Sequence, residues 1–153
     1  MNSIKYEGFL RKLSEMSEKG ILSYSEDAEL APHSTFKIGS VADLIVKVHN
    51  REALAEVLRA VHSEGIKYAV IGNGSNILFS DNRYEGVIIL TTGMTALTCE
   101  DNVIEAECGY SLTALASRAQ KMSLTGLEFA YGIPGSVGGA VFMNAGAYDG
   151  EIK

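Results

Sequence analysis

Two glycine-rich segments contain the residues whose types and spacing best suit ligand binding. The first, "GNGSN", occupies residues 72–76, directly after a short apolar run. Its two glycines let successive backbone N–H groups point inward, and its serine and asparagine side chains add neutral donors. This combination suits a phosphate group. An ordinary glycine turn between two strands is the alternative.

The residues missing from this loop narrow the choice of phosphate ligand. A P-loop closes with Gly-Lys-Ser/Thr, and residues 72–76 contain no lysine. The dinucleotide fingerprint needs a third glycine, a following helix and an acidic residue about 20 positions further on. Here Ile77 follows the loop, and residues 91–92 are both threonine. We therefore expect any pyrophosphate to bind in a loop between strands, and not at a helix N-terminus.

The second segment, "GIPGSVGGAVFMNAGAY", occupies residues 132–148. Pro134 fixes a turn, and Ser136 is expected to begin a short helix over 137–143. The smallest side chains of this helix belong to Gly138, Gly139 and Ala140. They would let a planar or polyphosphate ligand approach the backbone, with the amide of Asn144 nearby. Tight helix–strand packing without a ligand is the alternative.

The titratable side chains form no recognisable catalytic or metal-binding set. The sequence has three histidines, at positions 33, 49 and 62. Their spacing is not that of metal ligands. The arginines fall on predicted helices or in a polar turn, where a solvated charge is the simplest role. Cys99 and Cys108 lie in a predicted hairpin whose register places Cys99 opposite Ile104. We therefore expect two reduced thiols and no disulfide between them.

Composition limits the class of protein. The 153 residues are 46% hydrophobic, which is enough to bury a core, and the net charge is −6. No segment clusters lysine and arginine, so a phosphate-tracking nucleic-acid protein is excluded. No apolar run approaches the roughly 20 residues that span a bilayer, and the N-terminus lacks the apolar centre of a signal peptide. We expect a cytoplasmic protein with no nucleic-acid or membrane partner.

The first part of the chain is predicted to form a helix followed by a βαβ unit. Apolar spacing indicates an amphipathic helix over 3–19, after which residues up to 32 form an acidic connector. A strand over 42–49 and a strand over 67–71 flank a second helix. That helix is expected to begin after Asn50, which suits an N-cap.

The pattern then changes from parallel to antiparallel. Residues 77–79 are predicted to be extended, and a strand over 87–91 follows a polar turn. An antiparallel pair, 94–99 with 103–108, precedes a helix that is capped by Ser111 and closed by Gly126. The order favours two small α+β lobes, the first over 33–92 and the second over 93–153.

The motifs together resemble one enzyme family. "GNGSNILFSD" and "GLEFAYGIPGSVGGAVFMNAGAYDGEIK" resemble the UDP-N-acetylenolpyruvoylglucosamine reductase family, and "HSTFKIGSVAD" resembles the start of its FAD domain. The resemblance covers residues 33–153. It implies the two-lobed, α+β FAD-binding domain of the vanillyl-alcohol oxidase type, with FAD between the lobes and the second lobe incomplete. Ser34 and Ser40 depart from the residues usual in the family.

The resemblance also implies which residues contact the cofactor. It assigns the FAD pyrophosphate to Gly72, Asn73, Gly74, Ser75 and Asn76. It assigns the remainder of the flavin and its ribityl chain to Ile133, Pro134, Gly135, Ser136, Gly138, Gly139, Ala140, Asn144, Gly146 and Tyr148.

The activity implied is the reduction of UDP-N-acetylenolpyruvoylglucosamine to UDP-N-acetylmuramate, with NADPH as hydride donor, in peptidoglycan synthesis. The family's catalytic tyrosine–arginine pair, serine and glutamate lie beyond the segment equivalent to Lys153, so we expect this chain alone to be inactive. The alternatives are a flavin-binding module that needs a separate partner, a truncated product without flavin affinity, or another flavin oxidoreductase of this fold. Self-association through an open sheet edge is also expected.

Overall fold

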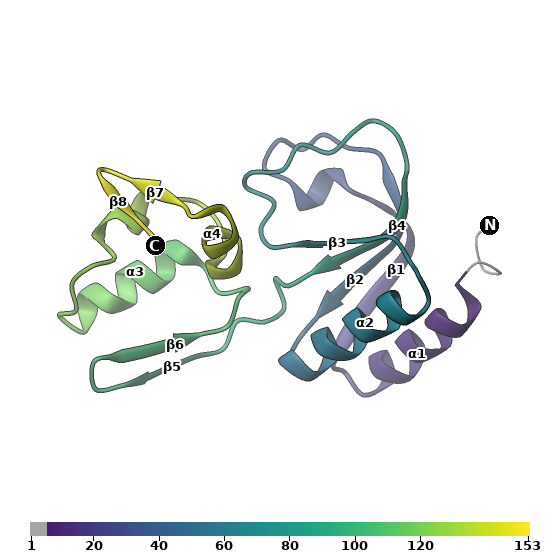
Figure 1. Ribbon diagram of the computed structural model, residues 1–153, viewed down its shortest axis with the longest axis horizontal. Coiled ribbons are helices and arrows are strands. Elements are labelled where there is room, and N and C mark those ends of the chain that lie inside the picture. Colours follow the sequence, from purple (N-terminus) through teal and green to yellow (C-terminus); the bar gives the residue numbers. More distant parts are fainter. Residues whose placement is uncertain (1–5) are drawn as a thin grey trace. The chain divides into compact units, whose positions relative to one another are not determined.

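The computed structural model describes residues 6–153 and divides the chain into two compact units. The first unit ends at Gly93 and the second begins at Met94. Figure 1 shows the first unit in purple to teal and the second in green to yellow. Helices and strands are mixed in each unit, which confirms the predicted α+β fold. Within residues 6–153, no helix is long and apolar enough to cross a membrane.

A four-stranded sheet with the order β1-β2-β4-β3 forms the centre of the first unit. Its strands are β1 (Leu22–Glu29), β2 (Val41–Val48), β3 (Tyr68–Ile71) and β4 (Tyr84–Leu90). Strand β1 runs antiparallel to β2, whereas β2 and β3 both run parallel to β4. The predicted βαβ unit corresponds to β2, α2 and β3. Its two strands are not neighbours in the sheet, because β4, which comes later in the sequence, lies between them.

Two amphipathic helices cover one face of this sheet (Figure 1). Helix α1 (Glu7–Glu18) buries Phe9, Leu13 and Met16, which lie on one side at helical spacing. The first residues of the helix predicted over 3–19 lie outside the described part of the chain. Helix α2 (Arg51–Ser63) begins as predicted, because the Asn50 side chain accepts a hydrogen bond of 2.8 Å from the Ala53 N–H.

Two sequence predictions about the first unit were wrong. The acidic connector predicted before residue 33 contains β1, which pairs with β2 along its whole length. Only Leu22 of this strand is buried, because an edge strand can satisfy its backbone while its polar side chains face water. Residues 77–79, predicted to be extended, form no strand and belong to the loop between β3 and β4. The side chains of Ile77 and Phe79 pack on the core, although their backbone is not part of the sheet.

A buried carboxylate joins four segments of the first unit. Asp43 on β2 is 3% exposed. Its Oδ2 accepts a hydrogen bond of 2.8 Å from the Tyr6 hydroxyl, and its Oδ1 accepts one of 2.7 Å from Arg83 Nε. The Arg83 guanidinium also forms an ion pair with Asp27 on β1. Both carboxylate oxygens therefore have donors, which offsets the cost of removing this charge from water.

The second unit contains two small hairpins and three short helices. Its elements are β5 (Leu97–Glu100), β6 (Val103–Ala106), α3 (Leu112–Lys121), the 3₁₀ helix η2 (Glu128–Gly132), α4 (Val137–Met143), β7 (Gly146–Ala147) and β8 (Gly150–Glu151). Cys99 lies opposite Ile104, as predicted, and both cysteines are free.

Both predicted N-caps of the second unit are confirmed. The Ser111 hydroxyl accepts a hydrogen bond of 3.3 Å from Ala114 N–H at the start of α3, and Ser136 caps α4 in the same way. The predicted end of α3 at Gly126 was wrong. The helix ends at Lys121, because the backbone turns left-handed at Ser123, where φ is +58°.

Replacing Tyr6 with phenylalanine is expected to destabilise the first unit. The substitution removes a donor from a buried charged acceptor, so the free energy of unfolding should fall by about 1–3 kcal/mol. Equilibrium urea unfolding followed by circular dichroism measures this change. Tyr24→Phe is the matched control, because the Tyr24 hydroxyl has no hydrogen bond to any residue in 6–153. Equal effects of the two variants would contradict the prediction.

Candidate functional site

The glycine loop at 72–76 is held by a second loop, residues 33–40. The Thr35 N–H donates to the Gly74 carbonyl at 3.3 Å, and the Ser34 hydroxyl donates to the Ile77 carbonyl at 2.8 Å. Further along, the Ser40 N–H donates to the Ser80 carbonyl at 3.3 Å. The two loops therefore run side by side, and the segment after β3 is positioned by residues from before β2.

The contact between these two loops requires a glycine at position 74. Its φ is +65°, in the left-handed region that favours glycine, and a Cβ at this position would overlap the carbonyl oxygen of His33. The close approach predicted for this glycine is therefore made by the protein itself. Whatever ligand the loop takes, its backbone shape is set by this packing.

The packing leaves the backbone donors of the loop unpaired. Among residues 6–153, none accepts a hydrogen bond from the N–H groups of residues 72–76. The same holds for the Ser75 hydroxyl and for the side-chain amides of Asn73 and Asn76. Lys37 lies on the adjacent loop, and its ammonium donates to the Pro32 carbonyl at 3.1 Å. Several unpaired N–H groups on one short turn suit an anion, and the assignment of these residues to a pyrophosphate stays a prediction.

The N-terminus of α4, in the second glycine segment, has no such free donors. The first N–H groups of the helix donate to Tyr110 and Cys108 carbonyls at 2.9 and 2.7 Å. The next two donate to the Ser136 hydroxyl and carbonyl, at 3.3 and 2.9 Å. The N–H groups of residues 137–139, which a helix normally leaves open, are therefore used by the protein, and that of Ala140 makes the first bond within the helix. The first turn of this helix therefore offers an anion no free N–H group.

Two glycines of the second segment, and Gly150 just after it, are explained by contacts within the unit. A Cβ on Gly138 would lie 2.8 Å from the Cβ of Cys108. A Cβ on Gly146 would lie 2.8 Å from the Gly150 carbonyl oxygen, and one on Gly150 would lie 2.8 Å from Phe129. Real Cβ atoms do not approach this closely, so tight packing, the alternative kept open by the sequence, accounts for these positions.

The other predicted flavin contacts have mixed surroundings. Ile133 packs on the apolar cluster of the second unit, where Ala140 is buried. Pro134 is exposed, and Gly135 has a φ of +150°. The hairpin β7–β8 carries Tyr148 at its tip, with 91% of the residue exposed.

Asn144 is held within the second unit. Its side-chain amide donates to Glu151 Oε2 at 2.8 Å, and its side-chain oxygen accepts from the Lys153 N–H at 3.0 Å. Both ends of this side chain are therefore already paired. Its left-handed backbone, with φ at +46°, ends α4.

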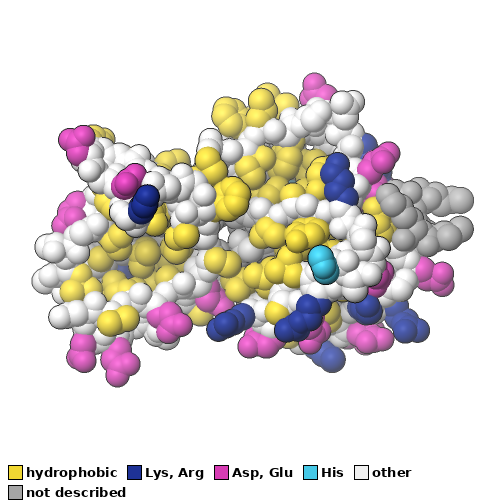
Figure 2. Space-filling model, viewed as in Figure 1, with side chains coloured by type: hydrophobic (Ala, Val, Ile, Leu, Met, Phe, Trp, Pro, Cys, Tyr) yellow, Lys and Arg dark blue, Asp and Glu magenta, His cyan; other side chains and the backbone are white. Residues whose placement is uncertain are grey.

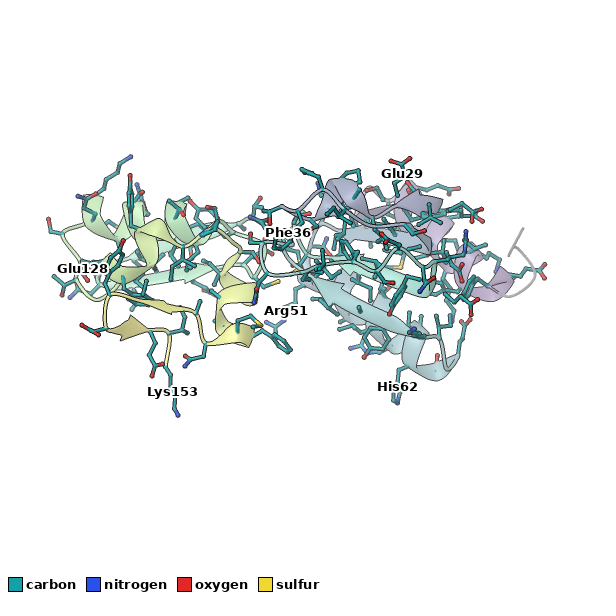
Figure 3. All side chains as sticks on the ribbon, turned by 90° about the horizontal axis from the view of Figure 1, so that it is seen from above. Glu29, Phe36, Arg51, His62, Glu128 and Lys153 are labelled. Carbon is teal, nitrogen blue, oxygen red and sulfur yellow. The ribbon has the colours of Figure 1, made fainter. Side chains whose placement is uncertain are left out.

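Sequence reasoning missed a group of exposed apolar residues on the paired loops of the first unit. Phe36, Ile38 and Leu78 are 57%, 50% and 67% exposed. Figure 3 labels Phe36. The alternation of side chains was present in the sequence, since Ile77 and Phe79 pack on the core and Leu78 between them is exposed. These side chains provide apolar surface on the loops that carry the free N–H groups.

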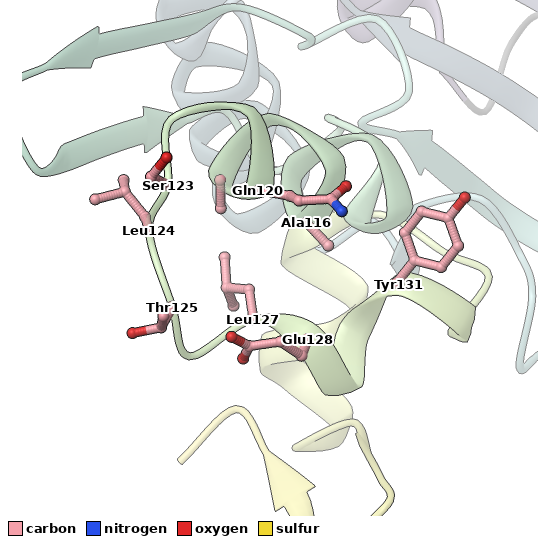
Figure 4. Close-up of a pocket in the computed structure, with 9 residues that line it drawn as sticks. Ala116, Gln120, Ser123, Leu124, Thr125, Leu127, Glu128 and Tyr131 are labelled. Carbon is pink, nitrogen blue, oxygen red and sulfur yellow. The ribbon is translucent and has the colours of Figure 1, made fainter.

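One hollow of the second unit is lined by no residue of its glycine segment. It lies between α3 and η2 (Figure 4) and has a volume of about 570 Å³. The residues that line it are Ala116, Ala119, Gln120, Ser123, Leu124, Thr125, Leu127, Glu128 and Tyr131. None of them was predicted to contact a cofactor.

A comparison with protein families identifies the domain. Residues 42–153 match the family described as the FAD binding domain. The chain belongs to this family. The match includes both glycine segments, the second unit and the first unit from residue 42 onward, and it agrees with the α+β fold expected for an FAD-binding domain. FAD is therefore the cofactor expected for a domain that contains these two segments.

Relatives and solved structures agree with this family. The chain is 46% identical over 150 residues to the UDP-N-acetylenolpyruvoylglucosamine reductase of Caldicellulosiruptor saccharolyticus, covering 98% of this chain and 46% of that protein. It is 49% identical over 132 residues to the reductase of Caldicellulosiruptor bescii, covering 86% of this chain and 42% of that protein. The chain thus spans less than half of the length of these relatives.

Among solved structures, the chain is similar to a UDP-N-acetylenolpyruvylglucosamine reductase from Thermus caldophilus, with a TM-score of 0.66 and 34% identity. That match covers 85% of this chain and 44% of the other. An alkyldihydroxyacetonephosphate synthase matches 93% of this chain, and 30% of its own, with a TM-score of 0.68. At 19% identity, this second likeness shows the fold alone.

Replacing Gly74 with alanine is expected to disrupt the paired loops. The left-handed backbone and the overlap with the His33 carbonyl should together lower the free energy of unfolding by at least about 2 kcal/mol. Urea unfolding measures the loss. Gly132→Ala is the control, because its Cβ would meet nothing within 4 Å, and it should change stability by less than about 1 kcal/mol.

His33 is expected to make the stability of the first unit depend on pH. Burial, and then the charges of Lys37 and Lys47, lower the pKa of His33 from 6.5. The unfolded chain therefore binds this proton at a higher pH than the folded chain does. Stability should be complete above pH 6.5 and decrease as the pH falls through the folded pKa. An imidazole titration by NMR that placed this pKa above 6.5 would contradict the prediction.

Proposed function

We propose that this chain is the FAD-binding portion of a UDP-N-acetylenolpyruvoylglucosamine reductase. The observation that carries the proposal is the set of unpaired N–H groups at 72–76, on a loop whose sequence and fold belong to an FAD-binding family. Identities of 46% and 49% to reductases favour this enzyme over other flavoproteins of the same fold. The protein would act in the cytoplasm, in peptidoglycan and cell-wall synthesis.

The two glycine segments would contribute to FAD binding in different ways. The loop at 72–76 would hold the pyrophosphate, because its N–H groups and the side chains of Ser75 and Asn76 are free to donate. The second segment would present a surface of small residues and the exposed Tyr148 to the remainder of the flavin. It would not supply the N–H groups of α4, which are already paired.

Bound FAD supplies two-electron chemistry that can pass a hydride from NADPH to the double bond of the enolpyruvyl group. The residues of this chain would bind and orient that cofactor. A hydride added beside a carboxylate also requires a cation to stabilise the developing charge and an acid to deliver a proton.

Two arginines of this chain already have partners. Arg83 is paired with two aspartates, and Arg118 donates to the Cys99 sulfur at 3.5 Å. Within residues 6–153, no cluster of potential metal ligands offers a Lewis acid in their place. We therefore propose that the reduction uses residues that this chain does not contain.

The proposal is tested by titrating the purified chain with FAD and following flavin fluorescence and absorbance. Saturable binding is expected, and Ser75→Ala and Asn76→Ala should each weaken it by about tenfold through the loss of a phosphate donor. Asn82→Ala is the matched control, since Asn82 is exposed beyond the loop and should leave the affinity unchanged. A folded chain that shows no saturable binding would overturn the proposal and favour a product without flavin affinity.

A further inference from the structure

The two edges of the four-stranded sheet in the first unit differ in how they are protected. Along β1, Glu26, Asp27 and Glu29 are exposed, and the backbone at Asp27 is left-handed, with φ at +47°. Charged side chains and a local break in the extended backbone keep an edge strand from pairing with another chain. Strand β1 is therefore a protected edge.

Strand β3, at the opposite edge, lacks these features. Its residues, 68–71, include no charge and no proline, and none has a left-handed backbone. Lys67, directly before the strand, folds back onto its own unit, with its ammonium 4.7 Å from the centre of the Tyr84 ring. Tyr68 and Val70 are 41% and 47% exposed. Figure 1 shows β3 at the near edge of the sheet, and in Figure 2 hydrophobic side chains gather over this part of the unit.

The backbone groups of β3 are free on alternate residues. The Ile71 carbonyl accepts a hydrogen bond of 3.0 Å from the N–H of Thr91, the residue after β4. Ile71 and Ala69, two positions before it, therefore direct their backbone groups at β4. Because successive residues of a strand point to opposite sides, the N–H and C=O groups of Tyr68 and Val70 point away from the sheet. Within residues 6–153, β4 is the only strand that pairs with β3.

The exposed side chains belong to the same two residues. Ala69 and Ile71 lie in the apolar cluster on one face of the sheet, so the side chains of Tyr68 and Val70 stand on the other face. A second β3 strand, related by a two-fold axis through Ala69 and perpendicular to the sheet, would place Tyr68 opposite Val70 of the copy. In that antiparallel register the free backbone groups of the two residues face each other, and their side chains meet on one face. A shift of one residue would set free groups opposite groups already bonded to β4.

We infer that β3 pairs with β3 of a second copy of this chain, in the antiparallel register that sets Tyr68 opposite Val70. The strand fits a copy of itself because its free backbone groups and its exposed side chains repeat at the same spacing, as a two-fold contact requires. A strand of four residues gives a contact smaller than the total of about 1,200 Å² of a standard interface, so the dimer should dissociate on dilution. The inference concerns the first unit alone and does not depend on whether FAD binds.

Sedimentation velocity of the 153-residue chain over a range of concentrations tests the inference. A dimer that dissociates on dilution is expected. Val70→Lys places a charge at the paired edge and should weaken the dimer by at least about tenfold, without unfolding the unit, because this side chain is already half-exposed. A chain that remains monomeric at about 1 mM would overturn the inference and leave the edge to a strand of another protein.

Two control variants place the same charge on other exposed strand positions. Ser25→Lys lies on the protected edge β1, and Val103→Lys lies on β6 of the second unit, where the residue is 67% exposed. Both should leave the dimer unchanged. If either control weakens the dimer as much as Val70→Lys does, the contact lies elsewhere and the inference is wrong.

A disulfide tests the register directly. Ala69 lies on the two-fold axis, opposite Ala69 of the copy in a pair without hydrogen bonds, where Cα atoms are about 4.5 Å apart and a disulfide can form. Ala69→Cys, made together with Cys99→Ser and Cys108→Ser, should therefore give a disulfide-linked dimer under mild oxidation. Val70→Cys in the same background should cross-link at least about tenfold more slowly, because its counterpart in the copy lies two residues away along the strand. Equal cross-linking of the two variants would contradict the register.

Discussion

The contact between Gly74 and the His33 carbonyl is the constraint on which the candidate site depends. A side chain at position 74 would overlap that oxygen, so the loop after β3 can lie against the loop before β2 only through a glycine. The hydrogen bonds between the two loops use carbonyl groups of residues 74–77 as acceptors. The N–H groups on the other side of the same peptides are thereby left without protein partners, which makes them available to an anionic ligand.

The two segments are both rich in glycine, but their glycines have different physical roles. In the first, a glycine lets two loops meet and leaves donors free. In the second, Gly138 lets a helix pack against a neighbouring segment, as Gly150 just beyond it does for a hairpin, and the N–H groups of the first turn of α4 are used. A dense cluster of glycines therefore shows only that some group, from the protein or from a ligand, lies close to the backbone of that segment. Whether protein or ligand makes that approach depends on which hydrogen bonds remain open.

The two units also differ in how completely they bury their apolar residues. In the first unit, β2 and β4 have long runs of buried residues, and a carboxylate with donors on both oxygens joins the helix, the sheet and the segment before β4. In the second, no residue of β5 or β6 is fully buried, whereas Leu112, Ala116 and Ala119 of α3 are buried.

The sequence alone determined the features that depend on short-range chemistry. The caps at Asn50, Ser111 and Ser136, the start of α4 and the hairpin register at Cys99 all follow from residues a few positions apart, and all are confirmed. The family, too, followed from contiguous motifs. Strand β1 was missed because a polar edge strand is stabilised by its partner and not by its own pattern.

Only the tertiary structure decided which glycines the protein needs for its own packing and which N–H groups stay free. Each of these depends on atoms from segments distant in sequence, such as His33 against Gly74 or Cys108 against Gly138, and no local pattern specifies that two such segments will touch.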